Sequence, residues 1–313
     1  MTRLILHRLA WSLPLLFVVT VMSFVLVSFV PGDPARTILG QSATQQQVDS
    51  LRQQLGLNQP LWTRYLNWLG GLFHGNLGSS LFTGESVSQL LNQRLGVTLT
   101  LMIAGTLVAT IIGVILGVTS AVRGGLLARL IDTLSLAGLA LPNFFLALVL
   151  VALFAVKLSW FPATGYVNFT ASPIDWFRSL VLPTVALAFT PITIVAAVAR
   201  EAMAGALTGE YVRVLQANGF SRRSVIYRHA LKNAGVPVVT IVAIMFVGLL
   251  TGTVFAEQIF ALPGLGSATV TAATQGDIPV VQGAVLYFTV IIVLVNILTD
   301  VAYGFLNPKV RVS

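Results

Sequence analysis

The side chains that most often perform catalysis are few in this sequence and far apart. The three histidines are His7, His74 and His229, and there is no cysteine. A thiol nucleophile, a disulfide and a zinc–thiolate site are therefore excluded. No catalytic triad or metal cluster can be assembled around the histidines, and His229 is interpreted as a contact on a helix surface.

A nucleotide site of the P-loop type needs a Gly-Lys pair followed by Ser or Thr. The three lysines, Lys157, Lys232 and Lys309, follow Val, Leu and Pro instead. Any ATP hydrolysis must therefore take place in another subunit, and we expect no cofactor in this chain. The segment "GLGSAT" at 264–269 lacks the third glycine of a dinucleotide turn, and we interpret it as an ordinary loop.

Positive charge is concentrated in one stretch, residues 210–233, which reads "EYVRVLQANGFSRRSVIYRHALKN". It contains five of the eighteen Lys and Arg residues, together with Gly219 and His229. These residue types are suited to recognition rather than to bond breaking. The question is what surrounding structure presents them.

The composition answers part of that question. Of 313 residues, 56% are hydrophobic and only 9% are charged, whereas soluble domains carry about a quarter charged residues. The mean hydropathy is +0.89. The net charge of +8 could indicate nucleic acid, but in a membrane protein excess Lys and Arg more often reflects topology. We therefore predict an all-α integral membrane protein that binds no nucleic acid.

Six apolar runs are long enough to span a bilayer, which takes about 20 residues. The first has no small-residue cleavage site after it and is interpreted as a retained helix rather than a signal peptide. A single transmembrane domain, 1–313, would contain all six, with a long external loop at 31–96 and a cytoplasmic loop at 200–235. The predicted spans are 9–30, 97–122, 133–156, 180–199, 236–258 and 281–306.

The positive-inside rule orients these spans. With the N-terminus inside, the inner segments carry twelve Lys and Arg and the outer segments six. Four of the outer six fall in the long loop, where charge has little weight. Both termini are therefore predicted to be cytoplasmic. The outer six are Arg36, Arg52, Arg64, Arg94, Lys157 and Arg178.

The external loop is predicted to be ordered. Thr44 to Gln47 form a capping box for a short helix that stops at Gly56. A second helix is expected to begin at Pro60, with one apolar face formed by Leu61, Trp62, Tyr65, Leu66 and Leu69. This face is either an aromatic girdle on the membrane surface or a docking lip for an external partner.

Two pairs of glycines, Gly113 with Gly117 and Gly248 with Gly252, are spaced for close helix approach in lipid. We interpret both as packing motifs, with a pore-lining role as the alternative. Ionisable residues near the membrane edges are few. Among them, Glu257 is assigned either to an outer gate facing the substrate, with Gly264 and Gly266, or to a solvated interface.

The basic stretch is predicted to form a helix, a left-handed turn at Gly219 and a second helix capped by Ser221. Phe220 and Val225 are expected to be exposed to the cytosol, and Pro237 to start the next span. Three functions fit this pattern: a DNA-binding helix-turn-helix, a basic element on anionic lipid, or a short helix that enters a groove on a partner protein. We favour the third.

The stretch from Glu210 to "GVPVV" resembles the cytoplasmic EAA loop of ABC importer permeases, which couples to the ATPase. The glycine at 219 and "HALKN" at 229–233 stand at the family spacing. The name-giving Glu-Ala-Ala positions read Arg213, Val214 and Leu215 here, and Lys232 replaces the usual proline. Both departures are common in the branch that carries dipeptides, oligopeptides and nickel.

Further motifs resemble that branch along the whole chain, and the order is similar to its B-type permease subunits. They are "FVPGDPA", "LGLNQPLWTRYLNWLGGLFHGNLGSSL", "EQIFALPGLG" and "NPKVR". The resemblance implies a type I importer transmembrane domain with six helices, in a bacterial inner membrane. The residues it assigns to ATPase coupling are Arg213, Ala217, Gly219, Phe220, Ser221, Arg222, Val225, Arg228 and His229.

The same resemblance implies a set of partners. These are a homologous second permease subunit, two ATPase subunits that hold ATP and magnesium, and an extracytoplasmic peptide-binding protein, besides membrane lipid. Each permease would form half of the translocation pathway. Another solute of the branch, such as a nickel chelate, glutathione or haem, is an alternative substrate. A self-contained channel or secondary carrier is a different class of function, and it would need no ATPase.

Overall fold

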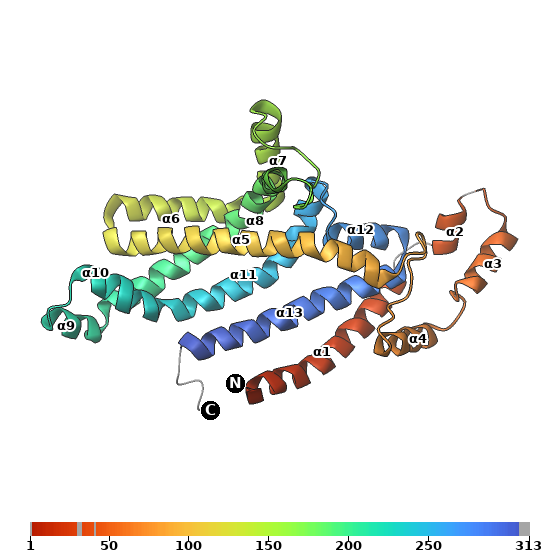
Figure 1. Cartoon of the computed structure of the whole chain (residues 1–313), viewed down its shortest axis with the longest axis horizontal. Coiled ribbons are helices and arrows are strands. Elements are labelled where there is room, and N and C mark those ends of the chain that lie inside the picture. Colours follow the sequence, from red (N-terminus) through yellow and green to blue (C-terminus); the bar gives the residue numbers. More distant parts are fainter. Residues whose placement is uncertain (1, 30–32, 41, 307–313) are drawn as a thin grey trace. The chain divides into compact units, whose positions relative to one another are not determined.

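A computed structural model describes residues 2–29, 33–40 and 42–306 of the chain. Its regular structure in these ranges is helical, apart from one isolated bridge between Ser79 and Ser86, so the all-α class is confirmed (Figure 1). The helices are α1 (Thr2–Ser28), α2 (Pro34–Leu39), α3 (Gln45–Gln54), α4 (Leu61–Phe73), α5 (Val87–Arg123), α6 (Gly125–Ala140), α7 (Asn143–Leu150), η1 (Val151–Lys157), α8 (Pro173–Thr208), α9 (Glu210–Ala217), α10 (Arg222–Ser224), η2 (Val225–Ala230), α11 (Leu231–Ile259), α12 (Leu265–Gln275) and α13 (Ile278–Leu306), where η1 and η2 are π-helical.

The chain forms two compact units. The first, which we call the core unit, contains Leu99–Leu262 and Leu294–Ser313 together with the first two residues. The second, the N-terminal unit, contains Arg3–Thr98 and Pro263–Val293. The long helices α5 and α13 each contribute residues to both units.

Five helices in the described residues are long and apolar enough to cross a membrane. Many of their large apolar side chains are exposed, including Trp11, Ile115 and Leu298, which are 66%, 59% and 67% exposed. Exposed apolar faces of this extent are expected where lipid, rather than water, surrounds the helix. The five segments are Arg8–Ser28, Val87–Arg123, Pro173–Thr208, Arg222–Ile259 and Ile278–Ala302.

The third predicted span needs correction, because no single helix covers 133–156. Helix α6 ends at Ala140, and α7 begins at Asn143 after Pro142. Leu141 has extended backbone angles (φ −85°, ψ 121°), as expected for a residue that precedes proline. The run is therefore divided into α6 and the shorter apolar helix Asn143–Lys157.

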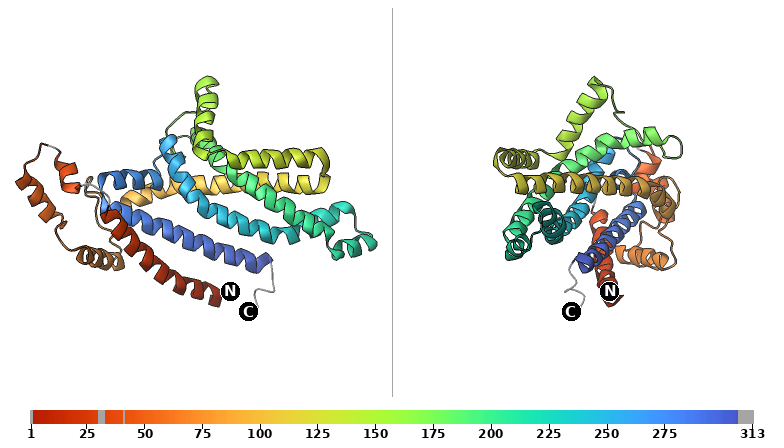
Figure 2. Two further views of the ribbon diagram at one scale, coloured as in Figure 1. Left: turned by 180° about the vertical axis from the view of Figure 1, so that it is seen from behind. Right: turned by 60° about the vertical axis from the view of Figure 1, so that its left-hand side comes forward.

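Helix α8 is central to the core unit and packs against α6, α7 and α11; Figure 2 shows α8 and α11 lying side by side. It also meets α5 at the first glycine pair. A Cβ atom on Gly117 would lie 2.4 Å from the carbonyl oxygen of Ala196, and one on Gly113 would lie 2.8 Å from Val195 Cβ. The packing role predicted for this pair is confirmed, since only glycine permits so close a contact.

The second glycine pair behaves differently. A Cβ on Gly252 would meet Leu187 Cδ2 at 3.0 Å, whereas one on Gly248 would meet no atom within 4 Å. Gly252 is therefore a packing residue, as predicted. Both glycines line an apolar cavity of about 380 Å³ between α7, α8 and α11, and Gly248 makes no such close contact.

In the N-terminal unit, α1, α4 and α13 share a buried polar network. The hydroxyl of Tyr65 lies 3.1 Å from Thr20 Oγ1, and Ser23 Oγ donates to Gln282 Oε1 at 2.5 Å. Tyr65 and Gln282 are both buried. The single apolar face predicted on α4 is thus divided, because Tyr65 packs inward on α1 while Trp62 remains 60% exposed.

The helices predicted in the 31–96 segment are confirmed in its described residues. Thr44 and Gln47 form a reciprocal capping box at the start of α3, and Gly56 after its end has a φ of 65°. Pro60 takes the N-cap position of α4, one residue earlier than the first helical residue. The loop before α5 is fixed by Asp277, which accepts hydrogen bonds from Ser80 Oγ at 2.5 Å and from the Leu81 amide at 3.2 Å.

Candidate functional site: a basic helical hairpin

The basic stretch forms a tight hairpin, which we define as residues 210–230. Helix α9 ends in a Schellman motif: the amide of Gly219 donates to the Gln216 carbonyl at 3.0 Å, and that of Phe220 donates to the Leu215 carbonyl at 3.1 Å. Gly219 has a φ of 80°, which an L-residue with a side chain adopts only at a cost. The predicted left-handed turn is confirmed.

The second arm of the hairpin begins at Ser221, directly after Phe220. Ser221 is the N-cap of α10, and its Oγ accepts a hydrogen bond from the Ser224 amide at 3.3 Å. The helix then continues without a break through η2 and α11, from Arg222 to Ile259. Pro237 therefore does not begin a helix, contrary to its predicted place in a first turn: it lies inside α11.

The basic side chains of the hairpin lie on its exposed surface. Arg213, on α9, and Arg222, at the start of α10, are exposed, as are Arg223 and Arg228. Ala217, Gly219 and Ser221 are exposed as well, and Phe220 is 45% exposed. The only carboxylate in residues 210–233 is Glu210, so the surface is strongly positive.

The predicted exposure of Val225 is wrong. Val225 is only 1% exposed, so it belongs to the interior and not to the contact surface. The physical reason is its position on the helix, because it lies beside the buried Ile226 at the start of η2. A basic stretch does not by itself reveal which of its apolar side chains turn inward.

Two surface residues escaped the sequence analysis. Val214 and Tyr227 are 58% and 63% exposed on the two arms of the hairpin. For Val214 the available signal was the helical period of α9. Val212 is buried, and a residue two positions further along a helix lies on another face. With Phe220, these side chains give the hairpin an apolar contact area among its arginines.

His229 contributes to the turn itself. Its ring lies edge-to-face with that of Phe220, with centroids 5.5 Å apart. Its Nε2 atom is buried and has no hydrogen-bond partner in the described part of the chain. Among those residues, no group of three His, Asp or Glu side chains could hold a metal ion. His229 therefore packs the turn, in line with the interpretation as a contact residue.

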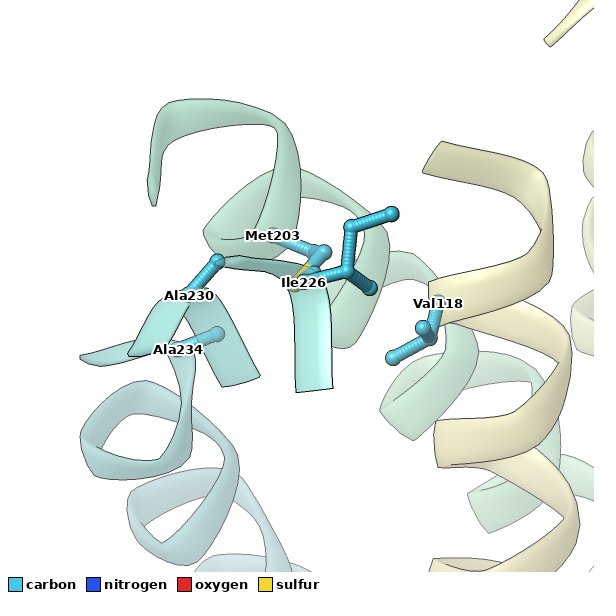
Figure 3. Packing of buried hydrophobic residues seen from close by; sticks show 5 residues of the cluster. All are labelled: Val118, Met203, Ile226, Ala230 and Ala234. Atoms are coloured by element: carbon cyan, nitrogen blue, oxygen red, sulfur yellow. The ribbon is translucent and has the colours of Figure 1, made fainter. Parts of the chain in front are cut away.

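The hairpin is attached to the core unit through a small apolar cluster. Ile226, Ala230 and Ala234 pack against Met203 on α8 and Val118 on α5 (Figure 3). Met203 and Ala230 are fully buried. Small alanine side chains permit α11 and α8 to lie close together, and the cluster brings η2 and α11 into contact with α8 and α5.

A charged pair lies near the same end of α8. Arg200 on α8 forms an ion pair with Asp132 on α6. The sequence analysis noted Asp132 only as an ionisable residue at a membrane edge. Each charge alone would be costly in an apolar environment, and their pairing joins α6 to α8.

The second predicted site lies at the other end of α11. Glu257, near the end of that helix, is fully buried, so the interpretation as a solvated interface residue is wrong. Gly264 and Gly266 are also buried. The segment "GLGSAT" is not a loop: it opens α12, and Thr98 Oγ1 accepts a hydrogen bond from the Leu265 amide at 2.8 Å. A role in an outer gate remains a prediction for Glu257, Gly264 and Gly266.

Two family models match the chain. Residues 109–312 match the family described as binding-protein-dependent transport system inner membrane component, and residues 1–102 match the N-terminal region of the same kind of component. The first match contains the whole hairpin. These matches confirm the resemblance found in the sequence motifs.

Full-length relatives are also similar. A peptide transport system permease protein of Brucella abortus is 40% identical over 99% of both chains. A peptide ABC transporter permease protein of Sinorhizobium fredii is 37% identical over 98% of both. The di/tripeptide transport system permease protein DppB of Pseudomonas aeruginosa is 35% identical over 99% of both.

Proposed function

The chain belongs to the family of binding-protein-dependent transport system inner membrane components, and on that premise we propose that it is the permease subunit of an ATP-driven peptide importer. It is a multi-pass membrane protein and a transport subunit that works in a complex with other subunits. Peptide as the substrate is supported by the names of its relatives, which cover nearly its full length.

The exposed face of the hairpin is the main support for a role in coupling to an ATPase. Its exposed face combines arginines with Val214, Phe220 and Tyr227, which suits a groove on a partner protein. Its second arm is one continuous helix with α11, from Arg222 to Ile259. A force applied at Gly219 therefore acts on a rigid lever that runs the length of a membrane-spanning helix.

The remaining subunits are those that the resemblance to ABC importer permeases implies. Two ATPase subunits would hold ATP and magnesium, in keeping with the lack of a Gly-Lys pair for a P-loop in this sequence. A homologous second permease would complete the translocation pathway, and an extracytoplasmic peptide-binding protein would deliver the substrate. Both termini and the hairpin would face the cytoplasm of a bacterial cell, which the distribution of Lys and Arg supports.

The mechanism we propose is mechanical. When ATP closes the ATPase pair, the hairpin moves with the groove that holds it. The apolar cluster around Ile226 passes this movement to α5, α8 and α11, and the spans rock to open the pathway outward. This is an alternating-access cycle in which the permease performs no bond chemistry.

Crosslinking tests the docking of the hairpin. Because the chain has no cysteine, Ser221→Cys and Ser224→Cys each introduce a unique thiol beside the turn. We expect both to crosslink to a co-expressed ATPase subunit, and Thr63→Cys on α4 not to do so. Crosslinks to lipid alone, or an equal yield from Thr63→Cys, would contradict a protein groove as the partner.

Reconstitution tests the function as a whole. In liposomes, uptake of labelled di- and oligopeptides is expected only when the second permease, the ATPases, the binding protein and ATP are all present. Peptide uptake by this chain alone would identify a self-contained channel or carrier instead. ATP-dependent uptake of a nickel chelate, glutathione or haem, but not of peptides, would retain the mechanism and change the substrate.

A further inference from the structure

The N-terminal unit contains a polar cavity that the coupling mechanism does not use. It has a volume of about 400 Å³ and lies between the end of α1, the short helices α2 to α4 and the turn between α12 and α13. Small-molecule sites commonly have volumes of about 300–1,000 Å³ and an apolar lining with a few polar groups. The volume lies in this range, but the lining is more polar: Val27, Leu57, Leu61 and Ile278 stand beside Ser28, Asp33, Arg52, Asn58, Gln275 and Arg64.

Arg64 is the one lining cation, among the described residues, that no carboxylate neutralises. Its side chain forms no ion pair or hydrogen bond to the part of the chain that the structure describes, and its guanidinium lies 5.9 Å from the ring centroid of Phe24. Burial lowers the pKa of Arg64 from its ordinary value, because the charged form loses solvation. Arginine nevertheless remains protonated at physiological pH. A half-buried cation in this state favours an anionic partner.

The second arginine of the cavity does not compete for that anion. Arg52 Nη2 lies 2.7 Å from Asp33 Oδ2, and Arg52 Nη1 lies 3.3 Å from Asp49 Oδ1. The hydrogen bond that Arg52 donates to Asp33, together with the negative charge of Asp33, raises the pKa of Arg52. Asp33 is thereby compensated in turn, so the unbalanced charge in the cavity is that of Arg64.

The backbone favours an anion at the same place. Asn58, Leu61 and Arg64 line the cavity at the N-terminal end of α4, a helix of 13 residues. No side chain caps this end, and Pro60 occupies the N-cap position. The first amides of a helix and its dipole both favour negative charge. Arg64 and the first turn of α4 thus line the same cavity.

We propose that this cavity binds the C-terminal carboxylate of a short peptide, with Arg64 as its ion partner and the apolar lining around Leu57 and Leu61 as the contact for a small side chain. This inference rests on the proposed function, since it gives the substrate a second point of recognition on the permease itself. A guanidinium is suited to this task because it can donate two parallel hydrogen bonds to one carboxylate.

The test measures binding of defined probes to the full-length protein in lipid nanodiscs by calorimetry. The probes are Ala-Ala, acetyl-Ala-Ala, which keeps the carboxylate, and Ala-Ala-amide, which lacks it. We expect Ala-Ala and acetyl-Ala-Ala to bind with similar affinity, and the amide to bind about tenfold more weakly or worse, because charge-assisted hydrogen bonds are the stronger class.

Three variants assign the effect to one side chain. Arg64→Gln should lose about tenfold in affinity for Ala-Ala and should no longer distinguish it from the amide. Arg64→Lys should restore part of the preference, as it returns the charge without the planar fork. Arg36→Gln removes the same charge from an exposed position on α2, outside the cavity lining, and should bind all three probes as the unmodified protein does.

Several results would overturn the inference. Equal affinity for Ala-Ala and its amide would do so, as would an unchanged affinity in Arg64→Gln or the absence of binding by all three probes. Its failure is separate from that of the proposed function, because ATP-dependent peptide uptake by the assembled transporter is measured independently. If the assembled transporter takes up peptides but the permease binds Ala-Ala and its amide equally, the cavity site is refuted and the proposed function is retained.

Discussion

At the scale of single residues, Gly219 determines the shape of the hairpin. Its positive φ permits the Schellman motif, which places the exposed Phe220 next to the N-cap Ser221. No atom lies within 4 Å of the place where a Cβ would be. The requirement for glycine is therefore one of backbone conformation and not of space.

Gly219→Val should uncouple transport without preventing membrane insertion. The left-handed conformation costs an L-residue roughly 1–2 kcal/mol, and more when it is β-branched. ATP-driven uptake is expected to fall about tenfold or more, since about 1.4 kcal/mol corresponds to a factor of ten. Uptake in proteoliposomes measures the effect, and the yield of purified protein reports on insertion.

The matched control is Gly205→Val. Gly205 lies in α8, is exposed and has open space around its Cβ position, but its φ is that of an ordinary residue. This variant should transport normally. If Gly219→Val transports as well as Gly205→Val, the turn at 219 is not part of the coupling path.

At the scale of the elements, α5 and α8 are held together at a distance that only glycine permits. The carbonyl oxygen of Ala196 and the amide of Arg200 both face the Cα of Gly117, and the Cβ of Ala199 is close by. In lipid there is little hydrophobic drive for helices to associate, so close packing of this kind supplies much of the attraction. Arg200 adds its ion pair with Asp132 on α6.

Gly117→Ala and Gly248→Ala should therefore have opposite effects on stability. The methyl group at 117 would lie 2.4 Å from a carbonyl oxygen, and overpacking of this kind costs typically about 1–3 kcal/mol. At 248 the methyl group meets no atom, and alanine is better than glycine in a helix by roughly 0.5–1 kcal/mol. Thermal unfolding in detergent should show a lower midpoint for the first variant and an equal or higher one for the second. A similar loss in both would contradict the close contact of α5 and α8.

At the scale of the whole molecule, the apolar helices are flanked by polar segments of opposite character. The loop 31–96 carries balanced charges, with the pair of Arg52 and Asp33 as an example. The hairpin carries arginines with almost no compensating carboxylate. The concentration of arginines in the hairpin, which lies in a short segment between two spans, is part of the basis for predicting that it faces the cytoplasm.

Labelling of single cysteines checks that orientation. Thr63, on α4, and Thr208, at the end of α8, are both exposed. A membrane-impermeant maleimide should label Thr63→Cys in intact cells, or in spheroplasts where an outer membrane must be removed. Thr208→Cys should be labelled only in inside-out vesicles. The reverse pattern would place the hairpin outside and remove the basis for ATPase coupling.

The sequence by itself determined the features that depend on local chemistry. Apolar runs of sufficient length predict spanning helices, and the capping box at Thr44, the turn at Gly219 and the N-cap at Ser221 follow from residue types a few positions apart. The end-to-end motif order identified the family. The break at Pro142 was also a local signal, but the continuous hydropathy of 133–156 concealed it.

Only the tertiary structure decided which side of each helix faces protein. Val225 was expected to be exposed and is buried, and Glu257, for which a solvated interface was one of two interpretations, is buried as well, while Val214 and Tyr227 were overlooked and are exposed. The pairing of Arg200 with Asp132 and the cavity at Arg64 join segments that are distant in the sequence. For the membrane-spanning helices, the physical reason is that lipid and protein interior are equally apolar. Hydropathy can therefore place a helix in the membrane, but it cannot say which of its faces is packed.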